Sequence, residues 1–259
     1  MKLLRFLHSG NIFFGALEGE QVRKISGDIF SDFQLCDELI ALRDVHLLSP
    51  VNTNLLLCVG KNYSAHAAEF HSEVPKSPVF FIKAPNSLNA PNDPVFLPPA
   101  EMSTMIDFEA ELAIVIGKSG KNIPEEKALE YVLGYTCAND ITARNWQRED
   151  GQWARGKSLD GFCPLGPWIE TELDPSDLKI EGRLNGQIMQ SARTSELVFK
   201  IPYLIHFISR GMTLNQGTVI LTGTPAGCGF AREPQVWLKK GDCFEVEIEG
   251  IGILKSKIE

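Results

Sequence analysis

The feature that most constrains the fold of this chain is the stretch Asp107–Gly117, with the sequence DFEAELAIVIG. Acidic and apolar residues alternate in its first half, and its second half is entirely apolar. Because successive side chains of a strand point to opposite faces, a strand over this stretch places Asp107, Glu109 and Glu111 on one face. Two interpretations are open: an edge strand with a solvated acidic face, or a strand whose acids surround a bound cation.

The composition is that of a globular protein with a sizeable core. The chain has 259 residues, of which 44% are hydrophobic and 22% charged, enough for one large or two modest domains. A net charge of −8 argues against nucleic acid or an anionic membrane as a partner. The six cysteines lack C-x-x-C spacing, and neither a signal peptide nor a membrane-spanning run is recognisable. We therefore expect a cytoplasmic protein with reduced thiols.

Turn chemistry predicts a boundary at Ser49-Pro50. Residues 1–50 have short apolar runs separated by turn residues, which is typical of a small β-rich N-terminal domain, with a short helix expected around Asp37–Arg43. Residues 51–259 alternate strand and turn patterns and form the predicted catalytic domain. The fold class expected for the whole chain is therefore α+β, rich in β-structure and with few helices.

Several elements of the second domain are predicted individually. A hairpin is expected with Asn185-Gly186 at its tip, and an amphipathic helix that ends at Gly211. A helix is also expected over Pro124–Tyr131, whereas the Gly-rich and aromatic segment 151–169 is expected to be a loop between strands.

Asp140 follows a separate predicted strand, at a place where its carboxylate can meet those of Glu109 and Glu111. Three oxygen donors without a nearby His or Cys suit a hard ion. The sequence thus predicts a site for Mg²⁺ or Mn²⁺, with Ca²⁺ as a further candidate.

Two further features suggest chemistry near such a site. His66 and Glu69 are three residues apart on a predicted helix, so the carboxylate can orient the imidazole as a general base; a plain surface pair is the alternative. Lys157, in RGKS, and the backbone N–H groups of the GTPAG segment (223–227) can hold a carboxylate or a developing enolate oxygen, although a solvated lysine is the simpler interpretation. GTPAG lacks the Gly-Lys-Ser/Thr ending of a P-loop, so nucleotide binding is not expected.

Six motifs occur in a fixed order: LCVGKNYSAHAAE, DFEAELAIVIG, GYTCANDITARNWQ, RGKSLDGFCPLGP, SELVFKIPYLIHFIS and ILTGTPAGCG. Over roughly residues 50–259 they resemble the fumarylacetoacetate hydrolase family, and more narrowly its bacterial single-chain and acylpyruvase-like members. The resemblance implies a mixed β-roll or sandwich in the catalytic domain, a small N-terminal domain and a homodimer.

The resemblance also implies roles for single residues. Mg²⁺ or Mn²⁺ is held at the positions matching Glu109, Glu111 and Asp140, which leaves Asp107 outside the ligand set. A catalytic His–Glu dyad on a segment that orders over bound substrate matches His66 and Glu69, and a lysine at the substrate matches Lys157. The positions that line the substrate pocket or receive the substrate carboxylate are matched by Arg144, Gln147 and Thr224.

These residues predict a metal-dependent enzyme acting on 2-oxo, β-diketo acids. The expected reaction is C–C bond hydrolysis of the acylpyruvate or fumarylacetoacetate type, with oxaloacetate decarboxylation as an additional activity. The alternative is a 2-hydroxyhepta-2,4-diene-1,7-dioate isomerase or 5-oxopent-3-ene-1,2,5-tricarboxylate decarboxylase of aromatic catabolism. A non-catalytic small-molecule-binding homologue is a third interpretation, because fold alone does not establish function.

Overall fold

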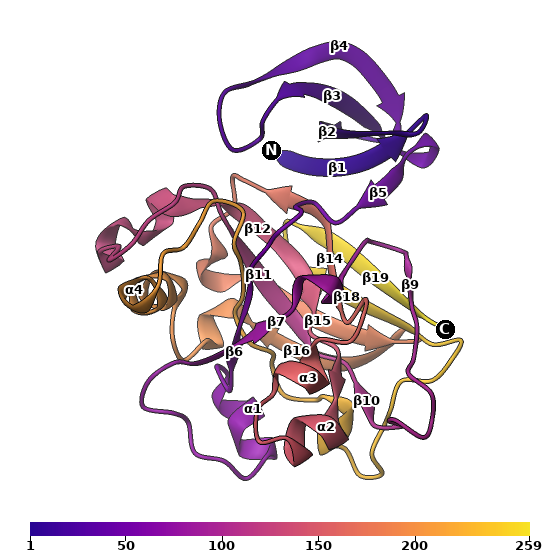
Figure 1. Ribbon diagram of the computed structural model, residues 1–259, viewed down its shortest axis with the longest axis vertical. Helices are drawn as coiled ribbons and strands as arrows, with labels where there is room; N and C mark the ends of the chain where they lie inside the picture. The colour runs from indigo at the N-terminus through magenta and orange to yellow at the C-terminus, as the bar shows by residue number, and fades with distance from the viewer.

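The computed structural model describes residues 1–259, and β-strands dominate it (Figure 1), which confirms the predicted fold class. The strands of the largest sheet are β1 (Lys2–His8), β2 (Asn11–Glu18), β3 (Gln21–Gly27), β4 (Phe33–Ala41), β5 (His46–Leu48), β6 (Leu56–Gly60), β7 (Val79–Lys83), β8 (Leu88–Asn89), β11 (Ala110–Ile116), β12 (Val132–Asn139), β14 (Cys163–Glu170) and β17 (Val219–Leu221). Their order is β4-β3-β2-β1-β14-β12-β11-β17-β6-β7, with β5 paired to β1 and β8 to β14.

A second, five-stranded sheet has the order β16-β15-β18-β19-β9, and β10 and β13 form a separate pair. The bounds of these strands are β9 (Pro94–Val95), β10 (Ile106–Asp107), β13 (Thr142–Ala143), β15 (Lys179–Leu184), β16 (Gln187–Arg193), β18 (Cys243–Ile248) and β19 (Gly252–Ile258). One apolar cluster joins the two large sheets, since it contains Leu112 of β11, Ile180 of β15 and Val246 of β18. The two large sheets therefore pack against each other as a β-sandwich.

Helices are few and short, as the sequence predicts. They are α1 (Ser64–Glu69), α2 (Arg144–Glu149), α3 (Ala154–Lys157) and α4 (Ile201–Gly211), together with the 3₁₀ helices η1 (Leu42–Asp44), η2 (Pro85–Ser87), η3 (Glu125–Tyr131), η4 (Pro175–Asp177), η5 (Thr194–Glu196) and η6 (Gly229–Ala231). The predicted helix over 124–131 is thus a 3₁₀ helix. No helix is long and apolar enough to cross a membrane. In Figure 1, α1, α2 and α3 gather at the end opposite the N-terminal strands.

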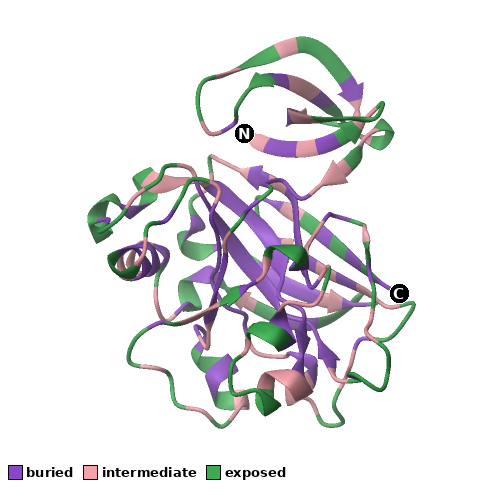
Figure 2. Cartoon of the chain, viewed as in Figure 1, coloured by how far each residue is buried: buried purple, intermediate pink, exposed green.

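The strand β11 carries most of the acidic stretch and lies at the centre of the large sheet, between β12 and β17. Every residue of β11 is buried, and its neighbours in Figure 2 are buried along most of their length. Leu112 and Ile114 belong to one apolar cluster and Ala113 and Val115 to another, so the predicted alternation of faces is confirmed. The alternative of a solvated edge strand is wrong.

The acidic stretch is not one continuous strand, however. β10 ends at Asp107 and pairs with β13, whereas β11 begins at Ala110 and pairs with β12 and β17. The Asp107 side chain accepts a hydrogen bond from the N–H of Phe108 at 2.9 Å, which takes that backbone donor away from a sheet ladder. The chain therefore changes partners just before the first predicted metal ligand.

The N-terminal strands β1–β4 form an antiparallel meander at the top of Figure 1. Leu4, Phe6, Val22 and Ile40 make a small core of their own, while β1 also pairs with β14 of the remaining chain. The helix expected around residues 37–43 is wrong, because β4 continues to residue 41 and pairs with β3. Tertiary pairing overrides local propensity there. The division of the chain at residue 50 stays a prediction.

The predicted hairpin turn is confirmed, whereas the loop predicted over residues 151–169 is wrong. The Asn185-Gly186 turn between β15 and β16 is confirmed, with φ values of 53° and 81° that fit a tight hairpin. The segment 151–169, expected to be a loop, instead contains α3 and most of β14. Pairing with β1 and β12 makes its apolar residues a strand of the central sheet.

Candidate active site

The three predicted metal ligands lie together. Ligand oxygens of Glu109, Glu111 and Asp140 are all within 4.8 Å of one another, and the side chains are buried. The pairing of β11 with β12 explains this. Ala110 lies opposite Asn139, so Glu109 and Glu111, which flank Ala110, come close to Asp140, which follows Asn139. We refer to these three acids as the carboxylate cage; their binding of a metal stays a prediction.

Two buried lysines contact the cage. The Nζ of Lys157 lies 2.7 Å from both Glu109 Oε2 and Asp140 Oδ2. The Nζ of Lys83 lies 2.7 Å from Asp140 Oδ1 and 3.1 Å from the carbonyl oxygen of Ile141. The sequence indicated Lys157 at this site but not Lys83. A lysine that closes the otherwise apolar strand VFFIK was the available signal, since buried lysines need a charged partner.

Arg144 connects the cage to Asp107. Its Nε donates to Asp107 Oδ2 at 2.8 Å, its Nη2 to Glu109 Oε1 at 2.6 Å and its Nη1 to Gln147 Oε1 at 3.0 Å. Asp107 also accepts a hydrogen bond from the N–H of Gly229 at 2.7 Å. Asp107 therefore anchors Arg144 and η6 and lies outside the cage, as the family resemblance implies.

The cage carboxylates differ in their charge balance. Burial opposes ionisation of Glu109, but Lys157 and a neighbouring guanidinium outweigh it and hold the pKa of that carboxyl well below its usual range. Burial, with the adjacent Asp140 and Glu109 charges, raises the pKa of Glu111 instead. Glu111 makes no ion pair, and its Oε2 accepts only the N–H of Gly223 at 2.6 Å. A buried carboxylate among like charges with oxygen-only donors fits a hard divalent cation.

His66 and Glu69 form the predicted dyad on α1. The imidazole Nδ1 lies 2.7 Å from Glu69 Oε1. Because an ionised carboxylate only accepts, we assign the proton to Nδ1, which leaves Nε2 free to accept one. Glu69 in turn accepts hydrogen bonds from the loop that faces it, from the N–H of Gly227 at 2.8 Å and the thiol of Cys228 at 3.4 Å. The alternative of a free surface pair is wrong, because His66 is buried.

Thr224 lies beside the cage, but its hydroxyl is already engaged. Its Oγ1 donates to the carbonyl oxygen of Ala110 at 2.9 Å and accepts from Gln190 Nε2 at 2.7 Å. Gln190 Oε1 in turn accepts the N–H of Ala110 at 2.9 Å. The sequence did not indicate Gln190, whose position in β16 carries no distinguishing signal. Recognition of a substrate carboxylate by Thr224 stays a prediction.

A single cavity of about 360 Å³ joins these groups, a size suited to a small molecule. The predicted site residues that line it are His66, Glu109, Glu111, Asp140, Arg144, Gln147, Lys157 and Thr224. Glu69 lies behind His66. Phe70 and Phe230 stack at 5.1 Å on one side of the cavity, and Phe81 meets Trp153 edge-on at 5.2 Å. The cavity thus combines the carboxylate cage, the dyad and an aromatic wall.

Lys83→Met is expected to lower the free energy of unfolding by about 3 kcal/mol, because it leaves the buried Asp140 with one cation fewer. Urea denaturation of the metal-free variant and parent measures the difference. Lys179→Met is the matched control: the exposed Lys179 pairs with Glu181, which keeps a second ion pair with Arg183, so we expect a loss of under about 1 kcal/mol. Equal losses in the two variants would contradict a special role for Lys83.

Comparisons with known proteins cover the whole chain. The family model described as fumarylacetoacetate (FAA) hydrolase C-terminal matches residues 56–259, and the one described as Rv2993c-like, N-terminal, matches residues 1–50. The mitochondrial oxaloacetate tautomerase Fahd2a of Rattus norvegicus is 45% identical over 225 residues, which are 85% of this chain and 71% of that protein.

Two solved structures share the complete fold. The 5-carboxymethyl-2-hydroxymuconate delta-isomerase from Mycobacterium smegmatis has a TM-score of 0.91 and 40% identity, covering 100% of this chain and 99% of its own. The fumarylacetoacetate hydrolase of psychrophilic Exiguobacterium antarcticum has the same TM-score of 0.91 and 40% identity, with coverage of 100% and 99%. These relatives carry the names of three different reactions on one architecture.

Proposed function

Because the chain belongs to the fumarylacetoacetate (FAA) hydrolase family, we propose that it is a divalent-metal-dependent enzyme that hydrolyses a C–C bond of a β-diketo acid. Acylpyruvates and fumarylacetoacetate represent the substrate type, and decarboxylation of oxaloacetate is an additional activity. One observation carries the proposal: the His66–Glu69 dyad faces the same cavity as the carboxylate cage. The homodimer that the resemblance implies is part of the proposal.

Glu109, Glu111 and Asp140 would hold the ion, for which Mg²⁺ or Mn²⁺ fits the oxygen donors best. When bound, the ion supplies Lewis-acid polarisation of the 2-oxo carbonyl. The buried position of the cage excludes bulk water from the reacting centre and so strengthens each charge interaction there.

The dyad supplies the proton transfers of hydrolysis. His66 Nε2 takes a proton from water, whose oxygen attacks the carbonyl farther from the 2-oxo acid, and Glu69 stabilises the resulting imidazolium. The C–C bond then breaks, with its electron pair passing to the 2-oxo fragment, and His66 returns the proton to the new carbon terminus. From an acylpyruvate, the products are a carboxylic acid and pyruvate. Lys157, within the cavity, stabilises the negative charge that develops on the 2-oxo oxygen.

A second candidate reaction is proton transfer without hydrolysis. The relatives named as a tautomerase and a delta-isomerase favour it. The same dyad can move a proton between an oxygen and a carbon, or between two carbons, without engaging water. The product of such a reaction keeps every carbon atom of the substrate, whereas hydrolysis gives two fragments.

Turnover by the purified protein tests these alternatives. With Mg²⁺ and an acylpyruvate, we expect release of pyruvate. A coupled lactate dehydrogenase assay and mass spectrometry detect it. A product of unchanged mass would support the isomerase instead. Stabilisation by Mg²⁺ without turnover of any 2-oxo acid in a broad panel would favour the non-catalytic binding homologue.

A further inference from the structure

A thiol lies directly beside the His66–Glu69 dyad, and the proposed reaction does not use it. Cys228 Sγ donates to Glu69 Oε1 at 3.4 Å, and the same oxygen lies 2.7 Å from His66 Nδ1. The candidate ligand atoms of the three side chains all lie within 4.8 Å of one another. An imidazole nitrogen, a carboxylate oxygen and a thiol sulfur therefore share one small volume.

This group of donors differs in chemistry from the carboxylate cage. The cage offers oxygen atoms only, which suit Mg²⁺ or Mn²⁺, whereas nitrogen and sulfur donors favour Zn²⁺. Once the thiol is deprotonated, one thiolate and one carboxylate balance the two charges of Zn²⁺. Because the complex is then neutral, the cost of placing the ion beside the buried His66 and Cys228 is reduced.

The spacing of the three atoms fits a cation after a small outward movement. With bonds of about 2.0–2.3 Å, tetrahedral Zn²⁺ keeps nitrogen and oxygen ligands roughly 3.3 Å apart and sulfur and oxygen ligands roughly 3.6 Å apart. The observed separations of 2.7 Å and 3.4 Å are those of the hydrogen bonds that the ion would replace. The Glu69 side chain is 17% exposed at the end of α1, which leaves it room to move outward.

The loop that carries Cys228 is fixed by its own contacts. Gly227 has a φ of 107°, and a side chain there would meet the carbonyl oxygen of Met189 at 2.1 Å. Arg232 donates to the carbonyl oxygen of Gly227 at 3.2 Å and to that of Met189 at 2.6 Å. The sulfur is therefore presented from a rigid backbone, which reduces the ordering cost of binding an ion.

Without a cation, the thiol of Cys228 keeps its proton. Burial, together with the nearby Asp107 charge, raises the pKa of this thiol. Coordination to a divalent cation deprotonates a thiol, so the proton passes to solvent when the ion binds.

We propose that His66, Glu69 and Cys228 form a second cation site, for Zn²⁺, whose occupation switches the dyad off. The ion takes the place of the proton on His66 Nδ1, and the single proton of the neutral imidazole then sits on Nε2. Nε2 therefore donates a hydrogen bond instead of accepting a proton, so it cannot act as the base. The cation site itself does not depend on the proposed reaction, whereas the loss of turnover does.

Binding of Co²⁺, a spectroscopic substitute for Zn²⁺, tests the site without turnover. A thiolate ligand gives Co²⁺ a strong charge-transfer absorption in the near ultraviolet, which the oxygen-only cage cannot produce. We expect this band in the parent protein saturated with Mg²⁺, and we expect Zn²⁺ to abolish it by displacing Co²⁺. Cys228→Ser keeps a hydrogen-bond donor to Glu69 but removes the sulfur, and it is expected to lose the band.

The two partly exposed thiols provide matched controls. Cys36→Ser and Cys243→Ser each remove a sulfur outside this cluster, and both are expected to keep the band. Glu69→Gln retains the shape of the side chain but removes the charged ligand, so the affinity for Co²⁺ is expected to fall at least about tenfold. This variant remains informative if Cys228→Ser does not fold.

Inhibition by Zn²⁺ tests the effect on the dyad. With Mg²⁺ in large excess, Zn²⁺ is expected to reduce turnover of the parent, and Cys228→Ser to need at least about tenfold more Zn²⁺ for half-maximal inhibition. Each protein is compared with its own rate in Mg²⁺ alone. Displacement of Mg²⁺ from the cage is the competing cause, and raising the Mg²⁺ concentration would relieve that inhibition in both proteins.

The outcomes separate this inference from the proposed function. Absence of the Co²⁺ band in the parent, or a band that persists in Cys228→Ser, would overturn the cation site. Equal inhibition of the parent and Cys228→Ser by Zn²⁺ would overturn its effect on the dyad. A cysteine-dependent band in a parent protein that turns over no 2-oxo acid would support the cation site and count against the proposed function.

Discussion

Glu111→Gln is expected to lower kcat/KM about 10²–10³-fold, because it removes one of the three carboxylates of the proposed metal site. The same variant should lose stabilisation by Mg²⁺, which amounts to about 2.7 kcal/mol at a metal concentration of 100 times Kd. Without metal, we expect the substitution to have the opposite effect on the free energy of unfolding. Glu111 is a buried carboxylate with no ion pair, so a neutral amide there leaves the metal-free protein as stable as the parent or more so. Urea denaturation with and without Mg²⁺ measures both effects.

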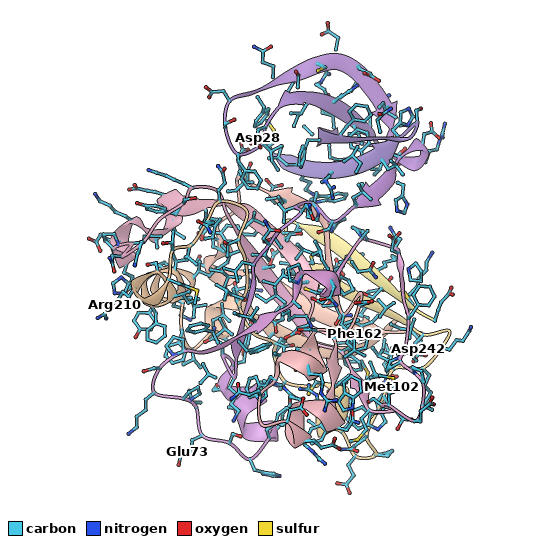
Figure 3. All side chains as sticks on the ribbon, in the orientation of Figure 1. Asp28, Glu73, Met102, Phe162, Arg210 and Asp242 are labelled. Carbon is cyan, nitrogen blue, oxygen red and sulfur yellow. The ribbon has the colours of Figure 1, made fainter.

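A metal ligand can be distinguished from a merely structural residue because its substitution changes stability differently with and without Mg²⁺. Glu109→Gln should also lose the Mg²⁺ effect, but it should destabilise the metal-free protein, since Lys157 and Arg144 then each lose one of their two carboxylate partners. Glu73→Gln, on the exposed loop after α1 (Figure 3), is the control and should behave like the parent. Parent-like stabilisation by Mg²⁺ in the Glu109→Gln, Glu111→Gln double variant would exclude the carboxylate cage as the metal site.

His66→Ala is expected to lower kcat about 10²–10⁴-fold while leaving stabilisation by Mg²⁺ unchanged, because it removes the proposed base without touching a cage carboxylate. Glu69→Gln should have a smaller effect on kcat, since the imidazole remains but loses its orienting charge. Steady-state kinetics, with Mg²⁺ titration of thermal stability in parallel, checks both variants.

His71→Ala is the control for the dyad, as His71 lies exposed on the segment after α1 and should not affect turnover. Normal kcat in His66→Ala would refute the assignment of the base, whatever the reaction. If His66→Ala instead loses hydrolysis but retains keto–enol exchange of the substrate, a different group must move that proton.

The central part of the fold and the cage were predictable from sequence because they depend on local periodicity. The alternation around Glu109 and Glu111 places both acids on one face of the chain. Asp140 directly follows the next strand, and the pairing of the two strands brings its carboxylate to the same face. The family resemblance then separated Asp107 from the ligands, which periodicity alone could not do. Asp107 points to Arg144 and η6 because β10 and β11 have different partners.

Other features depend on contacts between segments whose pairing no sequence pattern specifies. Lys83 reaches Asp140 across 57 positions, and Gln190 reaches Ala110 across 80. The segment 37–43 resembles a helix locally, but its residues 37–41 belong to β4 because β3 offers them a hydrogen-bonding partner. In each case the deciding interaction joins residues that are not neighbours in the sequence.

The placement of β11 between two paired neighbours has a consequence for biosynthesis. Since strand side chains alternate, a shift of its pairing by one residue would turn Glu111 into the apolar cluster and Leu112 towards the lysines. A molecule with such an error would expose its core as well as lose its cage, which makes it a target for chaperones and proteases. Cellular surveillance of folding therefore also inspects the carboxylate cage, and copies with a shifted β11 should not accumulate.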